Sequence, residues 1–289
     1  MKNIFKKKKT FAVCGSKDLK KTIDLKKFPM TGIFIKKKIN KNFPYYFNQK
    51  LNLCSKCGHI QLEKFISSKL LYNNIYANRT SASHLSDNAI NFFKNFLFKT
   101  LKTKKLKNIL EIGCNDIKLI NNLKKHANHI FGIDPIWIKK IKPKDKKFTI
   151  IGDFVENISF KKKIKKKINI FISTHNLEHI SNPYDVLKNV IESSDSEAKF
   201  FVEVPDADLM IKNFRFDQIF HQHYHYFSYR SLLNLIERLG CKIISKEINK
   251  NFWGGSLMIA FKKNKKKNLF IPKNHYKLYK NLILKNYSL

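Results

Sequence analysis

The sequence predicts an α/β protein with a doubly wound sheet of about seven strands, preceded by a small separate domain. From residue 108 to 261, short apolar runs alternate with stretches of helical periodicity, which is the element order of a doubly wound sheet. Residues 1–70 instead carry cysteines at a spacing typical of metal ligands. A chain of 289 residues is long enough for both parts and for a substantial core.

We divide the chain into four parts on this basis. They are a small N-terminal domain at 1–70, a linker and covering helix at 71–105, the main domain at 106–262 and a basic helical tail at 263–289. The basic start of the chain is followed by no apolar segment of the kind found in secretory leaders, and no apolar run is long enough to span a bilayer. We therefore expect a reducing cytoplasm and no membrane partner, with five cysteines that are ligands or core residues rather than disulfides.

The net charge of +37 raises the question of a nucleic-acid partner. Of the 58 basic residues only four are arginine, the residue that binds bases and phosphates through two parallel hydrogen bonds. Abundant lysine, isoleucine, asparagine and phenylalanine are what an AT-rich coding sequence produces. We interpret the lysine runs as solvated loops and expect no specific nucleic-acid binding.

The N-terminal domain contains half of a zinc site. Cys54 and Cys57 form the C-x-x-C-G pattern, whose spacing lets two thiolates face one ion. Cys14 is a third thiolate, and Phe11 stands where its partner would be. With His59 as a fourth ligand, these residues predict a structural zinc. The alternative is a small domain that has lost its metal and packs on apolar residues.

A strand, tight turn, helix and second strand open the main domain. The first strand is Asn108–Ile112, the turn begins at Gly113, and helical spacing runs over Lys118–His126. The second strand, His129–Ile133, stops at Asp134. A glycine turn before a helix, followed about twenty residues later by an acid, is the layout of an adenosine site. The three-glycine pattern of dinucleotide sites is not present, so we do not expect a pyrophosphate cradle.

The remaining elements follow in alternation. A helix that we place at Asp87–Thr100 is predicted to cover the edge of the main domain. Further predicted strands and helices are listed in chain order: strand Phe148–Ile151, strand Ile168–Ser173, helix Pro183–Ser193, strand Lys199–Val204, a helix capped by Ser228 that ends at Gly240, and the adjacent strands Cys241–Ile248 and Gly255–Phe261, predicted to be an antiparallel pair at one edge of the sheet.

Polar residues follow two of these strands. Asp153 and Phe154 come after the third strand, where they either contact an adenine ring and its amino group or are a strand end and a core residue. The fourth strand leads into His175, Asn176 and His179. The carboxyl ends of parallel strands meet at one edge of the sheet, where ligands of open α/β folds bind.

Three alternating histidines, His221, His223 and His225, lie before the capped helix. An extended segment would place all three on one side. Three imidazoles could bind a metal, but no carboxylate lies among them. Acid–base chemistry is the favoured interpretation because histidine titrates near neutral pH. A set of structural hydrogen bonds is the alternative.

Taken together, these motifs resemble the S-adenosylmethionine-dependent sugar C-methyltransferases that act on nucleotide-linked keto-deoxysugars and carry an N-terminal zinc-binding domain. The matching stretches in order are C-G and C-x-x-C-G, EIGCND with GIDP, NLEHI at 176–180, EVPD at 203–206, FDQIFHQHYHYFS at 216–228 and GGSLMIAF at 254–261. EIGCND by itself resembles motif I of the class I methyltransferases.

The resemblance implies a Rossmann-like class I methyltransferase fold, S-adenosylmethionine as cofactor and a structural zinc. It implies a cytosolic enzyme that removes a proton beside a ketone and methylates the resulting enolate. His223 is then the base, His179 a candidate for holding the sugar or its enolate oxygen, and His221 and Tyr76 further candidates on the substrate side. The expected cofactor contacts are Glu111, Gly113, Asn115, Asp116, Asp134, Pro135, Asp153, Phe154, His175 and Asn176.

The chain also departs from this family. Phe220 and Gln222 replace a phenol and a carboxylate that would tune or orient the base, and Ile117 replaces a glycine. The family's C-terminal domain has no counterpart before Leu289, so the nucleotide part of the substrate would have less protein to bind or would need a partner chain. Alternative functions are O- or N-methylation of a glycan or small metabolite, and a degenerate accessory subunit without catalysis.

Overall fold

The computed structural model describes residues 5–31, 46–68, 79–82, 84–265, 271–272, 274 and 276–287. Tyr76 therefore lies outside the described residues, and its role stays a prediction.

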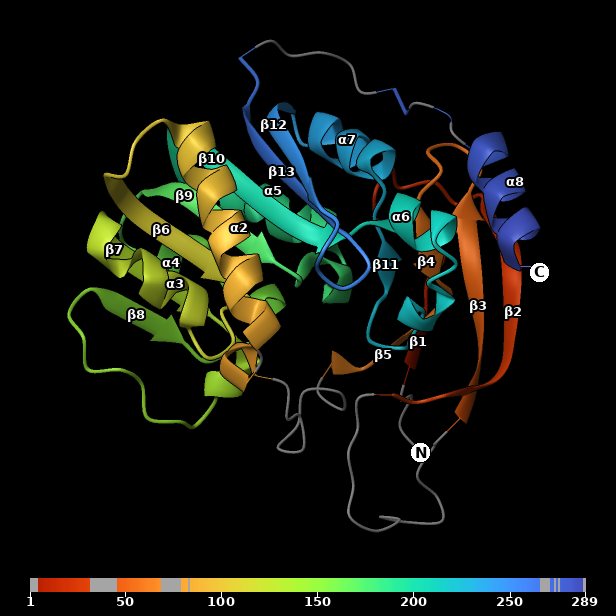
Figure 1. Cartoon of the computed structure of the whole chain (residues 1–289), viewed down its shortest axis with the longest axis horizontal. Helices are drawn as coiled ribbons and strands as arrows, with labels where there is room; N and C mark the ends of the chain where they lie inside the picture. The colour runs from red at the N-terminus through yellow and green to blue at the C-terminus, as the bar shows by residue number, and fades with distance from the viewer. Residues whose placement is uncertain are drawn as a thin grey trace.

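A seven-stranded sheet forms the centre of the main domain, in the order β12-β13-β10-β9-β6-β7-β8 (Figure 1). The strands are β6 (Leu106–Ile112), β7 (Ala127–Ile133), β8 (Phe148–Ile151), β9 (Ile168–Thr174), β10 (Ser194–Pro205), β12 (Cys241–Asn249) and β13 (Ser256–Lys263). β13 runs antiparallel to both of its neighbours, while the pairs among β10, β9, β6, β7 and β8 are parallel. The predicted antiparallel pair is confirmed, with β12 at the edge and β13 one position inside.

Helices cover both faces of this sheet, as a doubly wound fold requires. They are α2 (His84–Leu101), α3 (Lys118–Leu123), α4 (Phe160–Lys163), α5 (Pro183–Ser193) and α7 (Tyr229–Arg238). Two further helices, α6 (Ala207–Lys212) and α8 (Tyr276–Tyr287), belong to the core cluster of the N-terminal sheet. One core cluster joins α2 and α3 to the sheet, and the opposite cluster joins α4, α5 and α7 to it.

Helix α2 covers a face of the sheet, and its backbone lies close to the edge strand β12 and to β13. Its apolar side chains, including Phe93 and Phe96, are buried against Ile172 and Phe201 in the central strands β9 and β10. The periodicity correctly showed which side of the helix is apolar, but it contains no information about which strands that side contacts.

The N-terminal part forms a separate four-stranded sheet in the order β11-β4-β3-β2. Its strands are β2 (Leu19–Pro29), β3 (Tyr46–Cys54), β4 (Ile60–Leu62) and β11 (His225–Tyr226), and a small pair is made by β1 (Phe5–Lys7) and β5 (Lys64–Ile66). β11 comes from the histidine segment of the main domain and pairs antiparallel with β4. The histidine segment is thus part of the sheet of the other domain.

The C-terminal helix α8 packs against the N-terminal sheet and α6, on the right side of Figure 1. Tyr279 and Ile283 of this helix are fully buried in a cluster with Leu51 and Leu53 of β3. The Tyr279 hydroxyl donates a hydrogen bond to Asp208 Oδ1 at 2.6 Å. The predicted helical tail is therefore docked on the protein rather than extended from it.

The described part of the chain has no helix with the length and apolar character needed to cross a membrane. The five cysteines are not joined in disulfides in the structure.

Candidate active site and metal-binding cluster

A cleft opens at the carboxyl ends of β6, β7, β8 and β9. It is lined by Ser68, Gly113, Asn115, Ile133, Asp134, Pro135, Phe154, Val155, Glu156, His175, Asn176, His179 and Ile180. The predicted ligand contacts that line it are Gly113, Asn115, Asp134, Pro135, Phe154, His175 and Asn176. The motifs from four strand ends thus meet at one edge of the sheet.

Gly113 permits the tight turn at the floor of this cleft. Its φ of +69° is a conformation that side chains rarely adopt, and a Cβ there would lie only 2.4 Å from Asn176 Nδ2. The turn is held by a hydrogen bond from Gly113 N to Ile133 O of 2.8 Å. Glycine is needed at this position for both its backbone conformation and the close approach of Asn176.

Asp134 fixes the geometry of the same turn. Its Oδ2 accepts a hydrogen bond from Asn115 N at 2.8 Å, and its Oδ1 accepts one from Ile136 N at 2.9 Å. Burial nevertheless raises the pKa of Asp134, although both of these hydrogen bonds oppose the increase. Each carboxylate oxygen can accept a further hydrogen bond from a ligand hydroxyl.

Three predicted cofactor contacts do not line the cleft. Glu111 is buried beneath it, and burial, followed by the charges of Asp134 and Asp116, raises its pKa well above the usual range. Asp116 Oδ2 accepts a hydrogen bond from Ser81 N at 2.8 Å. Asp153 Oδ1 accepts hydrogen bonds from Phe154 N and Asn157 Nδ2 at 2.8 and 2.9 Å. Of the two residues after the third strand, Phe154 lines the cleft and can contact an adenine ring, whereas Asp153 does not line it and closes the end of the strand.

Ile117 is not among the cleft residues, but its backbone is strained. It is the residue before α3 and has a φ of +62°, in the left-handed region. A side chain there costs about 1–2 kcal/mol relative to glycine. The glycine found at this position in the family that the chain resembles is thus explained by backbone conformation.

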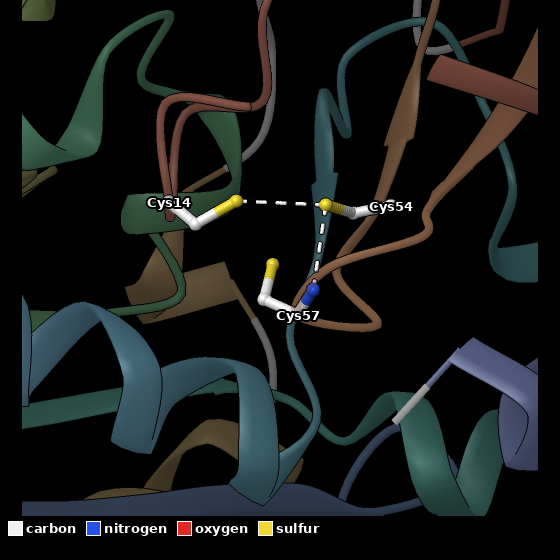
Figure 2. Close-up of side chains that lie close together, drawn as sticks. All are labelled: Cys14, Cys54 and Cys57. Carbon is white, nitrogen blue, oxygen red and sulfur yellow. Dashed lines mark hydrogen bonds between the residues drawn. The ribbon is translucent and has the colours of Figure 1, made fainter. Parts of the chain in front are cut away.

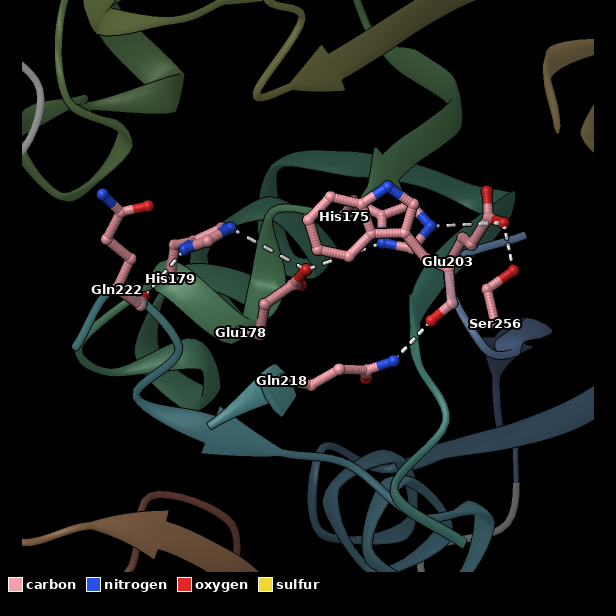
Figure 3. Close-up of polar contacts among 8 residues, drawn as sticks. His175, Glu178, His179, Glu203, Gln218, Gln222 and Ser256 are labelled. Atoms are coloured by element: carbon pink, nitrogen blue, oxygen red, sulfur yellow. Dashed lines mark hydrogen bonds and ion pairs between the residues drawn. The ribbon is translucent and has the colours of Figure 1, made fainter. Parts of the chain in front are cut away.

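Beside the cleft, two buried carboxylates and two histidines form a connected network (Figure 3). Ser256 Oγ donates to Glu203 Oε1 at 2.6 Å, and this oxygen is 3.5 Å from His175 Nε2. Glu178 Oε1 lies 3.8 Å from both His175 Nδ1 and His179 Nε2. His175 and His179 line the cleft, so the network reaches the ligand space directly.

The pKa values of the histidines are shifted in opposite directions. Burial lowers the pKa of His175, but the carboxylates of Glu203 and Glu178 outweigh burial and raise it overall. The pKa of His223 is well below the usual range because of burial first, and then the nearby imidazoles of His179 and His175. His223 is therefore neutral at physiological pH. Opposed shifts of this kind are typical of acid–base sites.

The three alternating histidines do not lie on one side of an extended segment, so that expectation is wrong. His221 turns to the N-terminal sheet, where its Nε2 donates to Phe28 O at 3.2 Å. His223 stacks beside His179 with ring centroids 4.8 Å apart. His225 Nδ1 lies 3.1 Å from His59 Nε2. A turn with a hydrogen bond from His223 N to Phe220 O breaks the extended alternation.

Glu178, Glu203 and Ser256 were not predicted as site residues. Glu178 is adjacent to His179 in the sequence, and this adjacency was the available signal. Glu203 and Ser256 are brought together only by the antiparallel pairing of β10 with β13.

The sulfur atoms of Cys14, Cys54 and Cys57 gather into one cluster (Figure 2). Cys14 Sγ is 3.5 Å from Cys54 Sγ, and the three sulfurs lie within 4.8 Å of one another. Tetrahedral zinc with Zn–S bonds of about 2.3 Å holds its sulfur ligands about 3.8 Å apart. Hydrogen bonds from Cys54 and Cys57 lower the pKa of Cys14, and the same interactions raise the pKa of the other two thiols. The donor set fits a zinc ion.

His59 is not part of this group. Its Nε2 is 3.1 Å from His225 Nδ1, and its ring packs edge-on against Phe11. Burial lowers the pKa of His59 to about 3, so the imidazole is neutral. The structure thus brings together three of the four predicted ligands. Phe11 fills apolar space beside the cluster at the position where a fourth thiolate was expected.

Two family models match the chain. A methyltransferase-domain model matches residues 82–246, and a zinc-binding-domain model matches residues 12–72. A curated relative, the C-methyltransferase NovU of Streptomyces niveus, is 37% identical over 81 residues. That match spans 28% of this chain and 19% of the relative, so the chain covers less than a fifth of the relative's length.

Solved methyltransferase structures also align with the chain. The N-methyltransferase NodS from Bradyrhizobium japonicum WM9, in complex with S-adenosyl-L-homocysteine, is 12% identical, with 68% of this chain and 96% of that chain covered and a TM-score of 0.48. Magnesium protoporphyrin IX methyltransferase from Synechocystis PCC 6803 is 9% identical, with 68% and 93% covered and a TM-score of 0.48. Because the methyltransferase model spans more than half of the chain and the strand order is that of the class I fold, this protein belongs to the methyltransferase family, as an S-adenosylmethionine-dependent enzyme joined to an N-terminal zinc-binding domain.

Proposed function

We propose that the protein C-methylates a nucleotide-linked keto-sugar. One observation carries the proposal: the cleft that suits the cofactor shares two of its lining residues, His175 and His179, with a buried cluster of histidines and carboxylates. A methyl donor in the cleft would therefore lie beside groups that can accept a proton. Methylation of carbon needs both, because the carbon must lose a proton to become nucleophilic.

The residues of the cleft fit S-adenosylmethionine. Ile133, Phe154 and Val155 supply apolar surface for an adenine ring. The carboxylate of Asp134 can accept from ribose hydroxyls. Asn176 Oδ1 is buried and has no hydrogen-bond partner among the described residues, so it suits a donor on the ligand. When bound, the cofactor supplies an electrophilic methyl group.

The protein's own residues handle the proton. We propose that neutral His223 accepts the proton from the carbon beside the ketone, while that C–H electron pair moves to form the enolate. His179 then holds the ketone oxygen as negative charge develops on it. The enolate carbon forms its bond to the methyl group as the methyl–sulfur bond breaks, and the proton on the imidazole passes to solvent.

His221 has a different place in the structure from the one the resemblance implies. Its ring is buried between Phe28 and Phe47 of the N-terminal sheet. We therefore propose that it supports the histidine segment and has no contact with substrate.

The C-methyltransferase name of the matched relative supports carbon as the methylated atom, although it refers to a protein of which the chain matches only a part. We propose a cytoplasmic reaction, in line with the resemblance to enzymes of nucleotide-linked sugars. We also propose that a partner chain binds the nucleotide portion of the substrate.

The test uses purified protein, labelled S-adenosylmethionine and a panel of nucleotide-linked 3- and 4-keto-sugars deuterated beside the ketone. We expect transfer of the label to sugar carbon with loss of deuterium, and His223→Ala should reduce it by at least about 100-fold. Methylated product that retains all deuterium would instead establish O- or N-methylation. Absence of transfer, together with a biological phenotype that is unchanged by His223→Ala, would establish an accessory role.

A further inference from the structure

The side chain of Gln222 does not reach the imidazoles. Its Nε2 donates to Thr31 O of the N-terminal part at 3.3 Å, and only its main-chain oxygen contacts the cluster, by accepting a hydrogen bond from His179 Nδ1 at 2.8 Å. Figure 3 shows its amide on the far side of His179 from Glu178. Position 222 therefore orients His179 through the backbone but supplies no negative charge.

The carboxylate of Glu178 does lie in this cluster. It belongs to the short 3-10 helix Leu177–His179 and not to the histidine segment that contains Gln222. The side chain of Glu178 is 1% exposed, and neither carboxylate oxygen has a hydrogen-bond partner among the described residues. One carboxylate oxygen of Glu178 and one ring nitrogen each of His179 and His223 lie within 4.8 Å of one another. A buried carboxylate without hydrogen bonds is costly unless a positive charge forms beside it.

The distances in the network show which groups lie nearest to each carboxylate. Glu203 Oε1 is 3.5 Å from His175 Nε2 and accepts a hydrogen bond from Ser256 Oγ at 2.6 Å. Glu178 Oε1 accepts no such hydrogen bond from the described residues, and it lies 3.8 Å from both His175 Nδ1 and His179 Nε2. A proton received by His179 or His223 would therefore place a positive charge beside the carboxylate of Glu178.

We propose that Glu178 is the positioning residue of the catalytic histidines: it stabilises the imidazolium that forms when the pair takes the proton of the substrate. In the family that the chain resembles, a carboxylate at position 222 would tune or orient the base, and Gln222 stands there in this chain. The inference rests on the proposed function, since it assigns Glu178 to the same proton transfer. It gives a role to a residue for which the resemblance implied none.

Glu178→Gln tests the proposal, because it keeps the shape of the side chain and removes the charge. We expect kcat to fall by about 10- to 100-fold, with cofactor affinity unchanged by calorimetry. Exchange of the proton beside the ketone into heavy water, measured with S-adenosylhomocysteine in place of the methyl donor, should slow by the same factor. Glu178→Asp, which keeps the charge, should recover part of both rates. Glu192→Gln, at an exposed site on α5, is the matched control and should leave them unchanged.

A second readout needs no substrate. The carboxylate of Glu178 helps to raise the pKa of His175, so NMR titration of the imidazoles should show a lower His175 pKa in Glu178→Gln. This result would support the electrostatic role even if no keto-sugar proved to be a substrate. Unchanged kcat and exchange in Glu178→Gln would overturn the proposal. So would loss of a bound divalent ion other than the cysteine-bound zinc, because Glu178, His179 and His223 would then be metal ligands.

Discussion

At the scale of single residues, two glycines with the same backbone angle have different surroundings. Gly113 and Gly240 both have a φ of +69°, but only Gly113 has a neighbour that a Cβ would meet. Gly240 follows α7 and has open space around the position of a Cβ. A side chain at Gly240 would therefore cost only backbone strain, whereas a side chain at Gly113 would cost the same strain and also collide with Asn176.

Gly113→Ala should weaken S-adenosylmethionine binding by at least about 10-fold, because the new methyl group displaces Asn176 from the cleft wall. Both Gly113→Ala and Gly240→Ala should lose about 1–2 kcal/mol of stability from the left-handed conformation. Calorimetric titration of each variant with the cofactor provides the measurement. Equal affinities for the two variants would show that the contact with Asn176 does not shape the binding site.

The sequence predicted the site residues that follow a strand end, and it failed for those that depend on contacts across the fold. Gly113, Asp134 and His175 were found because a parallel sheet places all its carboxyl strand ends on one edge. Glu203 lies inside a strand and was not predicted, because only the antiparallel register of β10 with β13 shows that Ser256 is beside it.

At the scale of elements, the cysteine cluster and the histidine segment are coupled through one strand. β4 begins three residues after Cys57 and pairs with β11, which contains His225. β11 was not predicted, because two residues carry no periodicity and the strand exists only through its partner. Strands with long apolar runs, such as β9, were predicted almost to the residue, since burial on both faces determines their composition.

Cys57→Ser should abolish the binding of one zinc per chain and lower the stability of the protein. It should also increase hydrogen exchange at the amides of His225 and Tyr226, because the turn that precedes β4 loses its cross-link. Zinc content by elemental analysis and exchange by mass spectrometry give the two readouts. Cys241→Ser, in a buried thiol of β12 outside the cluster, is the control and should retain its zinc. A full zinc content in Cys57→Ser would contradict the assignment.

At the scale of the whole molecule, the free energy of unfolding should depend on the protonation of one buried acid, Asp206. Asp206 caps α6 and accepts hydrogen bonds from Asp208 N and Leu209 N. Burial, followed by the charge of Asp208, raises its pKa to about 6. An unfolded aspartate titrates near 3.9, so the folded state binds this proton more tightly. The resulting stability is fully present below about pH 4 and is lost as the pH rises through about 6.

Asp206→Asn should therefore be more stable than the wild type at pH 7.5, by about 2–3 kcal/mol, and should lose this advantage near pH 4. Asparagine is as good a helix cap as aspartate, so the cap is retained. Thermal unfolding between pH 4 and 8 measures the difference. Asp185→Asn, at the exposed start of α5, should show no gain at neutral pH. A lower melting temperature for Asp206→Asn at pH 7.5 would mean that the charged cap is favourable.

The N-terminal sheet is assembled from three distant parts of the chain. β2, β3 and β4 come from residues 19–62, β11 from residues 225 and 226, and helix α8, which packs on this sheet, from residues 276–287. During synthesis the chain leaves the ribosome from the N-terminus onward, and contacts of such large sequence separation form late. The domain whose first strands are translated before the main domain is therefore completed after it, because the apolar surface of β3 stays uncovered until residues 276–287 have been synthesised.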